Sequence, residues 1–148
     1  MRFFVAGTPV SKGSAKAFVV KGKAVVTQDN AAAQKPWASS ISWLAHQAMQ
    51  GRKPTLGPVE ISLIFTMPRL QSHYGTGRNS GKVKDGAPVW HTSKPDLDKL
   101  VRCVKDALTG VVWKDDSQVA SMTQVVKVYG DQPGVTIIVN NLDTSMAL

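Results

Sequence analysis

The segment KPDLDKLVRCVKDALTG, residues 94–110, decides how this chain folds. Its apolar residues recur at the i, i+3, i+4, i+7 and i+11 spacing of one helix face: Leu97, Leu100, Val101, Val104 and Leu108. This periodicity predicts an amphipathic helix from about Asp96 to Thr109. Pro95 opens the helix and Gly110 is placed to close it. Because such a helix must bury its apolar stripe, the flanking segments are expected to supply a core for it.

The segments around this helix predict a sheet. Pro58 to Met67 alternates apolar and polar residues, which is typical of a strand, and two further strands are expected at about Val119–Tyr129 and Val135–Asn140. At the other end of the chain, Phe3–Gly7 has the composition of a strand. Ala17–Val20 and Ala24–Thr27 flank Lys21-Gly22-Lys23 and predict a hairpin.

A second helix is predicted between the hairpin and the strand at Pro58. Asp29 or Asn30 can cap it, and Gly51 ends it. Its apolar stripe consists of Trp37, Ile41, Leu44 and Ala48. The fold class is therefore α/β (α+β type): a small mixed sheet packed against two main helices, in one domain that spans residues 1–148.

Composition bounds the class of protein. With 43% hydrophobic and 19% charged residues, the chain can form a globular core. No apolar run approaches the roughly 18 residues that a membrane span needs, so no membrane partner is expected. Cys103 is the single cysteine and falls on the apolar side of the predicted helix, which favours a core position and excludes an internal disulfide. A cytoplasmic, reducing location is therefore expected.

Charge is divided unevenly along the chain. Its net charge is +8, but residues 1–90 carry twelve Lys and Arg against three acids, while residues 91–148 carry six against seven. Four of those acids stand in two pairs, Asp96 with Asp98 and Asp115 with Asp116. Many basic proteins bind no nucleic acid, so charge alone leaves that question open. A basic chain that gathers its carboxylates is, however, suited to hold a cation against a polyanion.

A long basic loop separates the strand from the helix. Residues 68–94 are rich in Gly, Ser, Lys and Arg, and a loop of this length in a compact domain is commonly functional or disordered. Its bases are Arg69, Arg78, Lys82, Lys84 and Lys94, interspersed with aromatic residues. Such side chains can grip phosphates and stack on bases, although a solvated insertion is an equal alternative.

The first acidic pair stands where the helix begins. Asp96 and Asp98 could not share a face inside a helix, since residues i and i+2 point roughly 200° apart. At the start of a helix the capping residue has non-helical dihedrals, so both carboxylates could converge on one cation. Mg²⁺ prefers a few carboxylates together with water and phosphate oxygens. Alternatively, the pair could simply cap the helix, and Asp115 with Asp116 could be a turn signal.

Arg102 lies four residues after Asp98 and four before Asp106, on one helix face. Surface ion pairs would explain this spacing at a few tenths of a kcal/mol each. In the functional interpretation, Arg102 lies near the metal and stabilises charge on a phosphate.

Three blocks of the sequence together resemble the RusA family of Holliday junction resolvases, which phages and prophages often encode. The blocks are KPDLDKL (94–100), DALTG (106–110) and WKDDSQV (113–119), with weaker similarity at residues 7–13 and 72–74. The resemblance implies a small mixed α/β fold, a homodimer, and Mg²⁺-dependent symmetric nicking of four-way DNA junctions, with Mn²⁺ as a possible substitute.

By position, Asp96, Asp98 and Asp116 match the metal-binding catalytic aspartates of that family, and Asp115 is an adjoining ligand or supporting acid. Two positions depart from the family pattern. Lys99 stands where asparagine is common, and Arg102 replaces an important lysine. Arginine keeps the charge and can clamp a phosphate, but it does not readily donate a proton.

The sequence therefore predicts a structure-selective endonuclease that resolves four-way DNA junctions. Asp96, Asp98, Asp116 and Arg102 are the predicted catalytic residues. The predicted DNA-binding residues are Lys12, Lys16, Arg69, Arg78, Lys82, Lys84, Lys94 and Lys99. Two alternatives stay open: a non-catalytic module that binds branched DNA by shape and charge, and a nuclease for flaps or other branched DNA.

Overall fold

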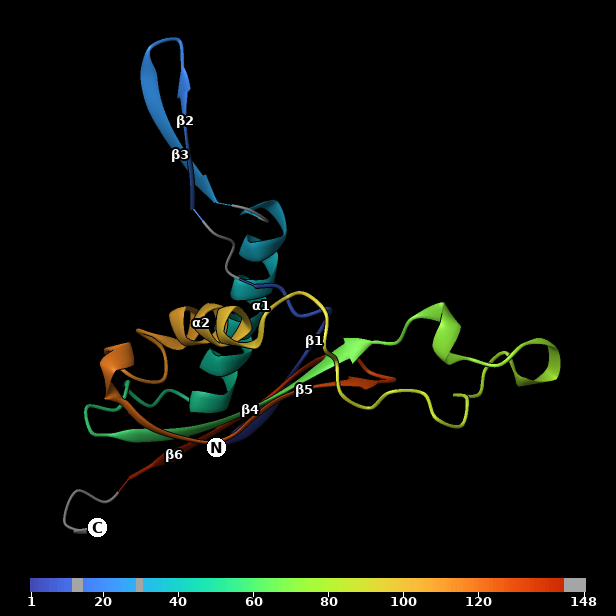
Figure 1. Cartoon of the computed structure of the whole chain (residues 1–148). Coiled ribbons are helices and arrows are strands. Elements are labelled where there is room, and N and C mark those ends of the chain that lie inside the picture. The colour runs from blue at the N-terminus through green and yellow to red at the C-terminus, as the bar shows by residue number, and fades with distance from the viewer. Residues whose placement is uncertain (12–14, 29–30, 143–148) are drawn as a thin grey trace.

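The fold is built on a four-stranded mixed sheet, seen in a computed structural model that describes residues 1–11, 15–28 and 31–142. The strand order is β1-β6-β4-β5, with bounds Arg2–Ala6, Gly134–Asn141, Val59–Pro68 and Val119–Gly130 respectively. β6 pairs antiparallel with β1 and β4, whereas β4 and β5 are parallel. The helices α1 (Ala31–Met49) and α2 (Leu97–Leu108) lie over one side of the sheet (Figure 1). The predicted α+β class is confirmed.

β4 forms the centre of the core. Buried and half-buried residues alternate along it, as predicted, and the buried residues are Val59, Ile61, Leu63, Phe65 and Met67. Trp37 and Ile41 of α1 pack into the same core, as the apolar stripe predicted, but Leu44 and Ala48 are only half-buried. The predicted caps Asp29 and Asn30 lie outside the described residues.

α2 packs on this core through six buried residues: Leu100, Val101, Cys103, Val104, Ala107 and Leu108. Cys103 is 2% exposed, which confirms its place in the core. The sequence suggested that Pro95 opens the helix. The structure differs, because Asp96 is the N-cap residue and Pro95 precedes it, outside the first helical turn. Gly110 follows the C-cap residue with φ of +85°, where the left-handed backbone favours glycine.

The short apolar run after α2 anchors the chain before it enters β5. Trp113 is fully buried, and its Nε1 donates a hydrogen bond to Thr109 Oγ1 at 3.1 Å. The backbone N–H of Thr55 donates to Val112 O at 2.9 Å, and Thr55 forms an isolated parallel bridge with Trp113. The segment before β4 is thus tied to the segment before β5.

Two projections leave the body of the molecule (Figure 1). The predicted hairpin is confirmed as β2 (Ala15–Val20) and β3 (Lys23–Gln28). Residues 69–94 form the second projection, called the arm below, which contains the short helices η1 (Gln71–His73) and η2 (Gly77–Asn79).

The arm doubles back on itself through backbone hydrogen bonds. Gly75 N donates to Lys82 O at 3.0 Å, and Lys84 N donates to His73 O at 2.8 Å. At Gly75 a Cβ atom would lie 2.7 Å from the carbonyl oxygen of Asn79, so this close approach requires glycine. The loop that the sequence left as either functional or disordered is therefore an ordered hairpin-like structure.

We expect Leu100→Ala to lower the free energy of unfolding by about 2–5 kcal/mol, since Leu100 is a fully buried residue of α2, the helix that also carries Asp98. Leu56→Ala makes the same chemical change at a side chain that is 77% exposed, and should cost less than about 0.5 kcal/mol. Urea unfolding midpoints of the two variants measure the difference. Equal midpoints would contradict the placement of α2 on the core.

Candidate active site

Asp96 holds the N-cap position of α2 without capping it. Its dihedrals are extended (φ −68°, ψ 142°), as expected at the start of a helix, but its side chain accepts no capping hydrogen bond. The contribution of about 0.5–2 kcal/mol that a capping aspartate can make is therefore not used here. Asp98 follows in the first turn, where the helix dipole favours a carboxylate. Helix capping thus does not explain why Asp96 is an aspartate.

An exposed cleft of about 200 Å³ lies along α2. One face of α2 supplies four of its lining residues: Asp98, Val101, Arg102 and Lys105. The other two are Asp116, from η3 (Asp116–Gln118), and Met122, from β5. The fold thus brings Asp98, Asp116 and Arg102 to one surface. Asp96 and Asp115 are exposed and are not among the residues that line the cleft.

The two residues of the second acidic pair have different roles: Asp115 caps a turn, and Asp116 lines the cleft. The Asp115 side chain accepts a hydrogen bond from Ser117 N at 2.9 Å and caps η3. Hydrogen bonds from the backbone and side chain of Ser117 lower the pKa of Asp115 below its ordinary value, so it stays ionised and keeps this role. Asp116 comes first in η3 and lines the cleft.

Gln118 completes a capping box with Asp115. Its Oε1 accepts hydrogen bonds from Lys114 N at 2.9 Å and Asp115 N at 2.8 Å. Its Nε2 donates to Thr55 O at 2.8 Å and Gly57 O at 2.9 Å. One side chain therefore ties the acidic turn to the segment that precedes β4.

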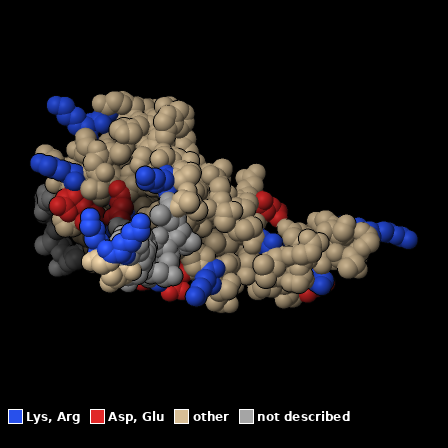
Figure 2. All heavy atoms as spheres, turned by 90° about the horizontal axis from the view of Figure 1, so that it is seen from above, with Lys and Arg blue, Asp and Glu red and all other residues tan. Residues whose placement is uncertain are grey.

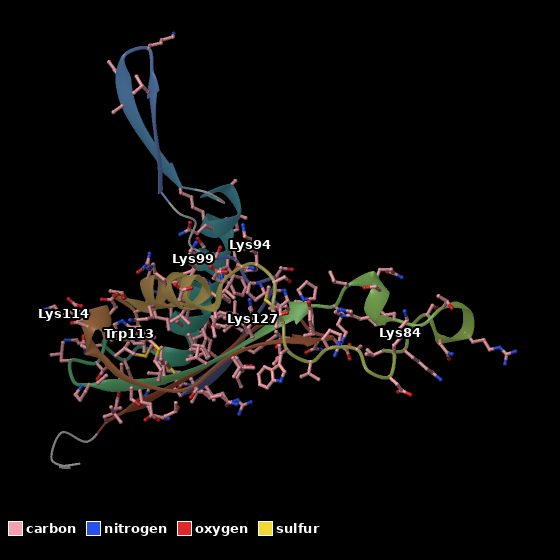
Figure 3. All side chains as sticks on the ribbon, viewed as in Figure 1. Lys84, Lys94, Lys99, Trp113, Lys114 and Lys127 are labelled. Carbon is pink, nitrogen blue, oxygen red and sulfur yellow. The ribbon has the colours of Figure 1, made fainter. Side chains whose placement is uncertain are left out.

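Lys127 of β5 fixes the segment that leads into α2. Its Nζ donates to Ser93 O at 2.7 Å and to Pro95 O at 2.6 Å, directly before Asp96. Figure 3 shows Lys127 close to this segment, with Lys84 farther out on the arm. Because the ammonium group donates to two carbonyl oxygens, it anchors the backbone just before Asp96 and Asp98 to the sheet.

Aromatic contacts hold the root of the arm around Tyr129. The His73 ring meets the Tyr129 ring edge-on at 4.6 Å between centroids, and the His91 ring lies 4.9 Å away. Arg69 places its guanidinium 5.7 Å from the Tyr129 centroid and donates to Pro88 O at 2.8 Å. Burial lowers the pKa of His91, and the positive charge of Lys127 lowers it further.

The predicted DNA-binding residues have different surroundings. Arg78, Lys82 and Lys84 are exposed on the arm, and Lys94 is exposed before α2. Arg69 and Lys99 are half-buried, and Arg69 braces the root of the arm. Lys12 lies outside the described residues, and Lys16 belongs to β2 but its side chain is not described. Their contacts with DNA stay predictions.

Figure 2 shows a group of Asp and Glu at one end of the body with Lys and Arg beside it, and single acidic as well as basic side chains farther along, including on the arm. Lys and Arg on either side of the acidic group could contact phosphates of a DNA backbone.

The donor chemistry of the cleft fits a hard divalent cation. Asp98 and Asp116 offer carboxylate oxygens at an exposed surface, which is the kind of ligand Mg²⁺ takes together with water and substrate phosphates. Among the described residues, no group of three or more His, Cys, Asp or Glu side chains is preassembled for a metal ion. The third carboxylate that the sequence predicted, Asp96, is not among the residues that line the cleft.

Sequence reasoning assigned no role to Gln118 and Lys127. A usable signal existed for Gln118, since the spacing Asp115-x-x-Gln118 is that of a capping box. Lys127 gave no such signal, because a lone lysine within a strand does not reveal which distant backbone it meets.

Comparison with known proteins gives the class of the chain. Residues 6–140 match the family described as Endodeoxyribonuclease RusA. The chain therefore belongs to the RusA endodeoxyribonuclease family, and the predicted resemblance is confirmed. Membership supports a nuclease of the Holliday junction resolvase type, acting on branched DNA.

A curated relative is similar to the chain over nearly its whole length. It is "Uncharacterized protein YqaN" of Bacillus subtilis (strain 168), 31% identical over 144 residues, which cover 96% of each chain. In the described part of the chain, none of the helices combines the length and hydropathy that a membrane crossing requires.

We expect Lys127→Met to raise the pKa of His91, because the variant removes a nearby positive charge. The pKa should still lie below the ordinary 6.5, since burial is the larger cause. NMR titration of the His91 ring protons measures this, with Lys53→Met as a control for the loss of one exposed lysine. An unchanged His91 pKa in Lys127→Met would contradict the effect of the Lys127 charge on His91.

The lowered pKa of His91 also predicts how the free energy of unfolding changes with pH. The unfolded chain protonates His91 at a higher pH than the folded chain does, so the free energy of unfolding should fall as the pH drops below about 6.5. His91→Gln should weaken this dependence in urea unfolding between pH 7 and pH 5. An identical dependence in both proteins would contradict the assignment.

Proposed function

We propose that the chain resolves four-way DNA junctions by Mg²⁺-dependent, paired nicking of the phosphodiester backbone. The observation that supports this most is the cleft in which Asp98, Arg102 and Asp116 meet, in a chain of the RusA family. A cytoplasmic location suits this activity.

Asp98 and Asp116 would hold Mg²⁺, or Mn²⁺ in its place, from the two sides of the cleft. Asp96 would add a third carboxylate, since its side chain is not engaged in capping. When bound, the ion supplies a Lewis acid that polarises the scissile phosphate and lowers the pKa of a bound water. Asp115 would support Asp116 by capping the turn that carries it.

Arg102 would bind the scissile phosphate. Its guanidinium stays protonated and presents a planar fork of donors, so it can neutralise negative charge that develops on the phosphate oxygens. It would not serve as a proton donor to the leaving group, in contrast to the lysine expected at this position. Lys105 lines the same cleft and could add charge there.

The arm would hold the DNA. Arg78, Lys82 and Lys84 are exposed along it, and Lys94 is exposed at its end, just before α2. Together with Lys12, Lys16, Arg69 and Lys99, these residues would track phosphates from the arm toward Asp98. Aromatic residues of the arm could stack on bases exposed at the branch point.

A homodimer would supply the second nick. Four-way junctions are resolved by cuts in two opposed strands, and a two-fold symmetric pair of clefts presents two such sites at once.

A non-catalytic module for branched DNA is the second candidate. It is favoured by Arg102 in the position of a lysine, and by the lack of a preassembled group of three metal-ligating side chains among the described residues. Tight, salt-sensitive junction binding without cleavage in Mg²⁺ or Mn²⁺ would select this candidate. Parallel assays with a junction, a flap and a linear duplex would separate a junction resolvase from a flap nuclease.

We expect Asp98→Asn and Asp116→Asn each to slow cleavage of a synthetic four-way junction about 100-fold or more, because several kcal/mol of charge stabilisation depend on the bound ion. Asp96→Asn should slow it as well. Asp131→Asn makes the same change in the exposed turn after β5 and should cleave normally. Wild-type rates in Asp98→Asn or Asp116→Asn would contradict the assigned site.

Lys84→Ala should weaken junction binding and reduce the slope of log K against log salt by about 1, since one phosphate contact is lost. Lys53→Ala, which removes an exposed lysine in the segment before β4, should leave both quantities unchanged. Fluorescence anisotropy in EDTA at several salt concentrations measures both. Equal slopes in the two variants would remove the arm from the DNA-binding surface.

A further inference from the structure

The side chain of Gln118 uses its full hydrogen-bonding capacity. Its oxygen accepts from two backbone N–H groups, of Lys114 and Asp115, and its nitrogen donates to two backbone carbonyls, of Thr55 and Gly57. All four distances lie between 2.8 and 2.9 Å. A primary amide has two acceptor positions and two donors, so none remains for solvent or DNA.

This network stands where the parallel ladder of β4 and β5 is interrupted. Thr55 pairs with Trp113, and the next paired residues are Val59 and Val119. Between these two points the first segment advances four residues and the second advances six. The second segment is therefore two residues longer, and it forms a turn outside the ladder that carries Asp115 and Asp116. Gln118 bridges the gap in place of backbone hydrogen bonds.

Gln118 connects the acidic turn itself to the neighbouring segment. Within the turn, Asp115 caps η3, but that hydrogen bond is local and connects the turn only to itself. The two bonds from Gln118 Nε2 connect it to the segment before β4. Asp116 follows Asp115 directly and lines the cleft opposite α2, so a shift of the turn would move its carboxylate relative to Asp98.

We propose that Gln118 is the positioning residue that holds the Asp116 carboxylate in register with Asp98. This inference rests on the proposed function, because it assigns Gln118 to the same cleft. Gln118 touches neither DNA nor the ion and acts through the backbone of the turn. Its loss should therefore weaken metal binding in the cleft and leave binding of the DNA arms unchanged.

The network also requires glutamine at this position, rather than glutamate or methionine, which are similar in size. Glutamate has nearly the same shape, but its carboxylate only accepts, so it would face the carbonyl oxygens of Thr55 and Gly57 without a donor. Methionine has a similar length and supplies no comparable hydrogen bond. Gln118→Glu thus retains the half of the network toward Asp115, whereas Gln118→Met removes both halves.

The first measurement needs neither metal nor DNA. Amide hydrogen exchange in EDTA should be about 10-fold faster or more at Lys114 and Asp115 in Gln118→Met, since these N–H groups lose their acceptor. Gln132→Met makes the same change at an exposed glutamine and should exchange at the wild-type rate. Unchanged exchange in Gln118→Met would overturn the proposed network.

The second measurement separates positioning from stability. At a temperature where every variant is folded by circular dichroism, the Mg²⁺ concentration for half-maximal junction cleavage should rise about 10-fold or more in Gln118→Met. The effect should be of the same sign in Gln118→Glu. Junction affinity in EDTA should stay within about 2-fold of wild type. If both variants cleave with wild-type Mg²⁺ dependence, the role of Gln118 is structural only and the inference fails.

Direct binding of Mn²⁺, followed by electron paramagnetic resonance, keeps the inference testable without cleavage. If the wild type cleaves no junction in Mg²⁺ or Mn²⁺, the proposed function fails, and the Mn²⁺ affinities then decide about Gln118. Weaker Mn²⁺ binding by Gln118→Met and Gln118→Glu than by Gln132→Glu would support the inference. Equal Mn²⁺ affinities in the three variants would overturn it.

Discussion

The parallel pairing of β4 with β5 is the constraint on which the site depends. Parallel neighbours require a crossover, and here the crossover consists of the arm and α2. Because α2 must bury its apolar face on the sheet, its polar face with Asp98 and Arg102 is turned outward beside the start of β5. The ladder is interrupted just before β5, and the turn that leaves it presents Asp116 to the same cleft.

Structural and chemical tasks are assigned to different side chains at this site. Lys127 holds the backbone before α2, and Gln118 with Asp115 holds the turn before β5. Asp96 stands at a capping position without using its carboxylate there, and Asp116 lies beside an aspartate that does the capping. The Asp96 carboxylate, which does no capping, can serve a cation, whereas Lys127, Gln118 and Asp115 form hydrogen bonds with the backbone around the acids.

The sequence predicted the elements well because their signals are local. The 3.6-residue period of α2, the alternation along β4 and the Gly22 turn each depend on neighbouring residues, and each element was found close to its expected bounds. The meeting of Asp98 with Asp116 was also predictable, since one helix and one short segment separate them. The supporting contacts were not. Lys127 meets Pro95 and Gln118 meets Gly57 only through the tertiary fold, and no local period encodes such pairs. The order of the arm likewise depends on remote packing against Tyr129.

The most direct test of the cleft as a metal-dependent nuclease site is the position of Mn²⁺ in crystals of the protein with an uncleavable four-way junction. Anomalous diffraction locates the ion without reference to activity. We expect the anomalous peak between the carboxylates of Asp98 and Asp116, with Asp96 turned toward it and a junction phosphate in contact with Arg102. A peak bound elsewhere, or a junction phosphate seated in this cleft with no ion beside Asp98 and Asp116, would contradict the assignment of the cleft.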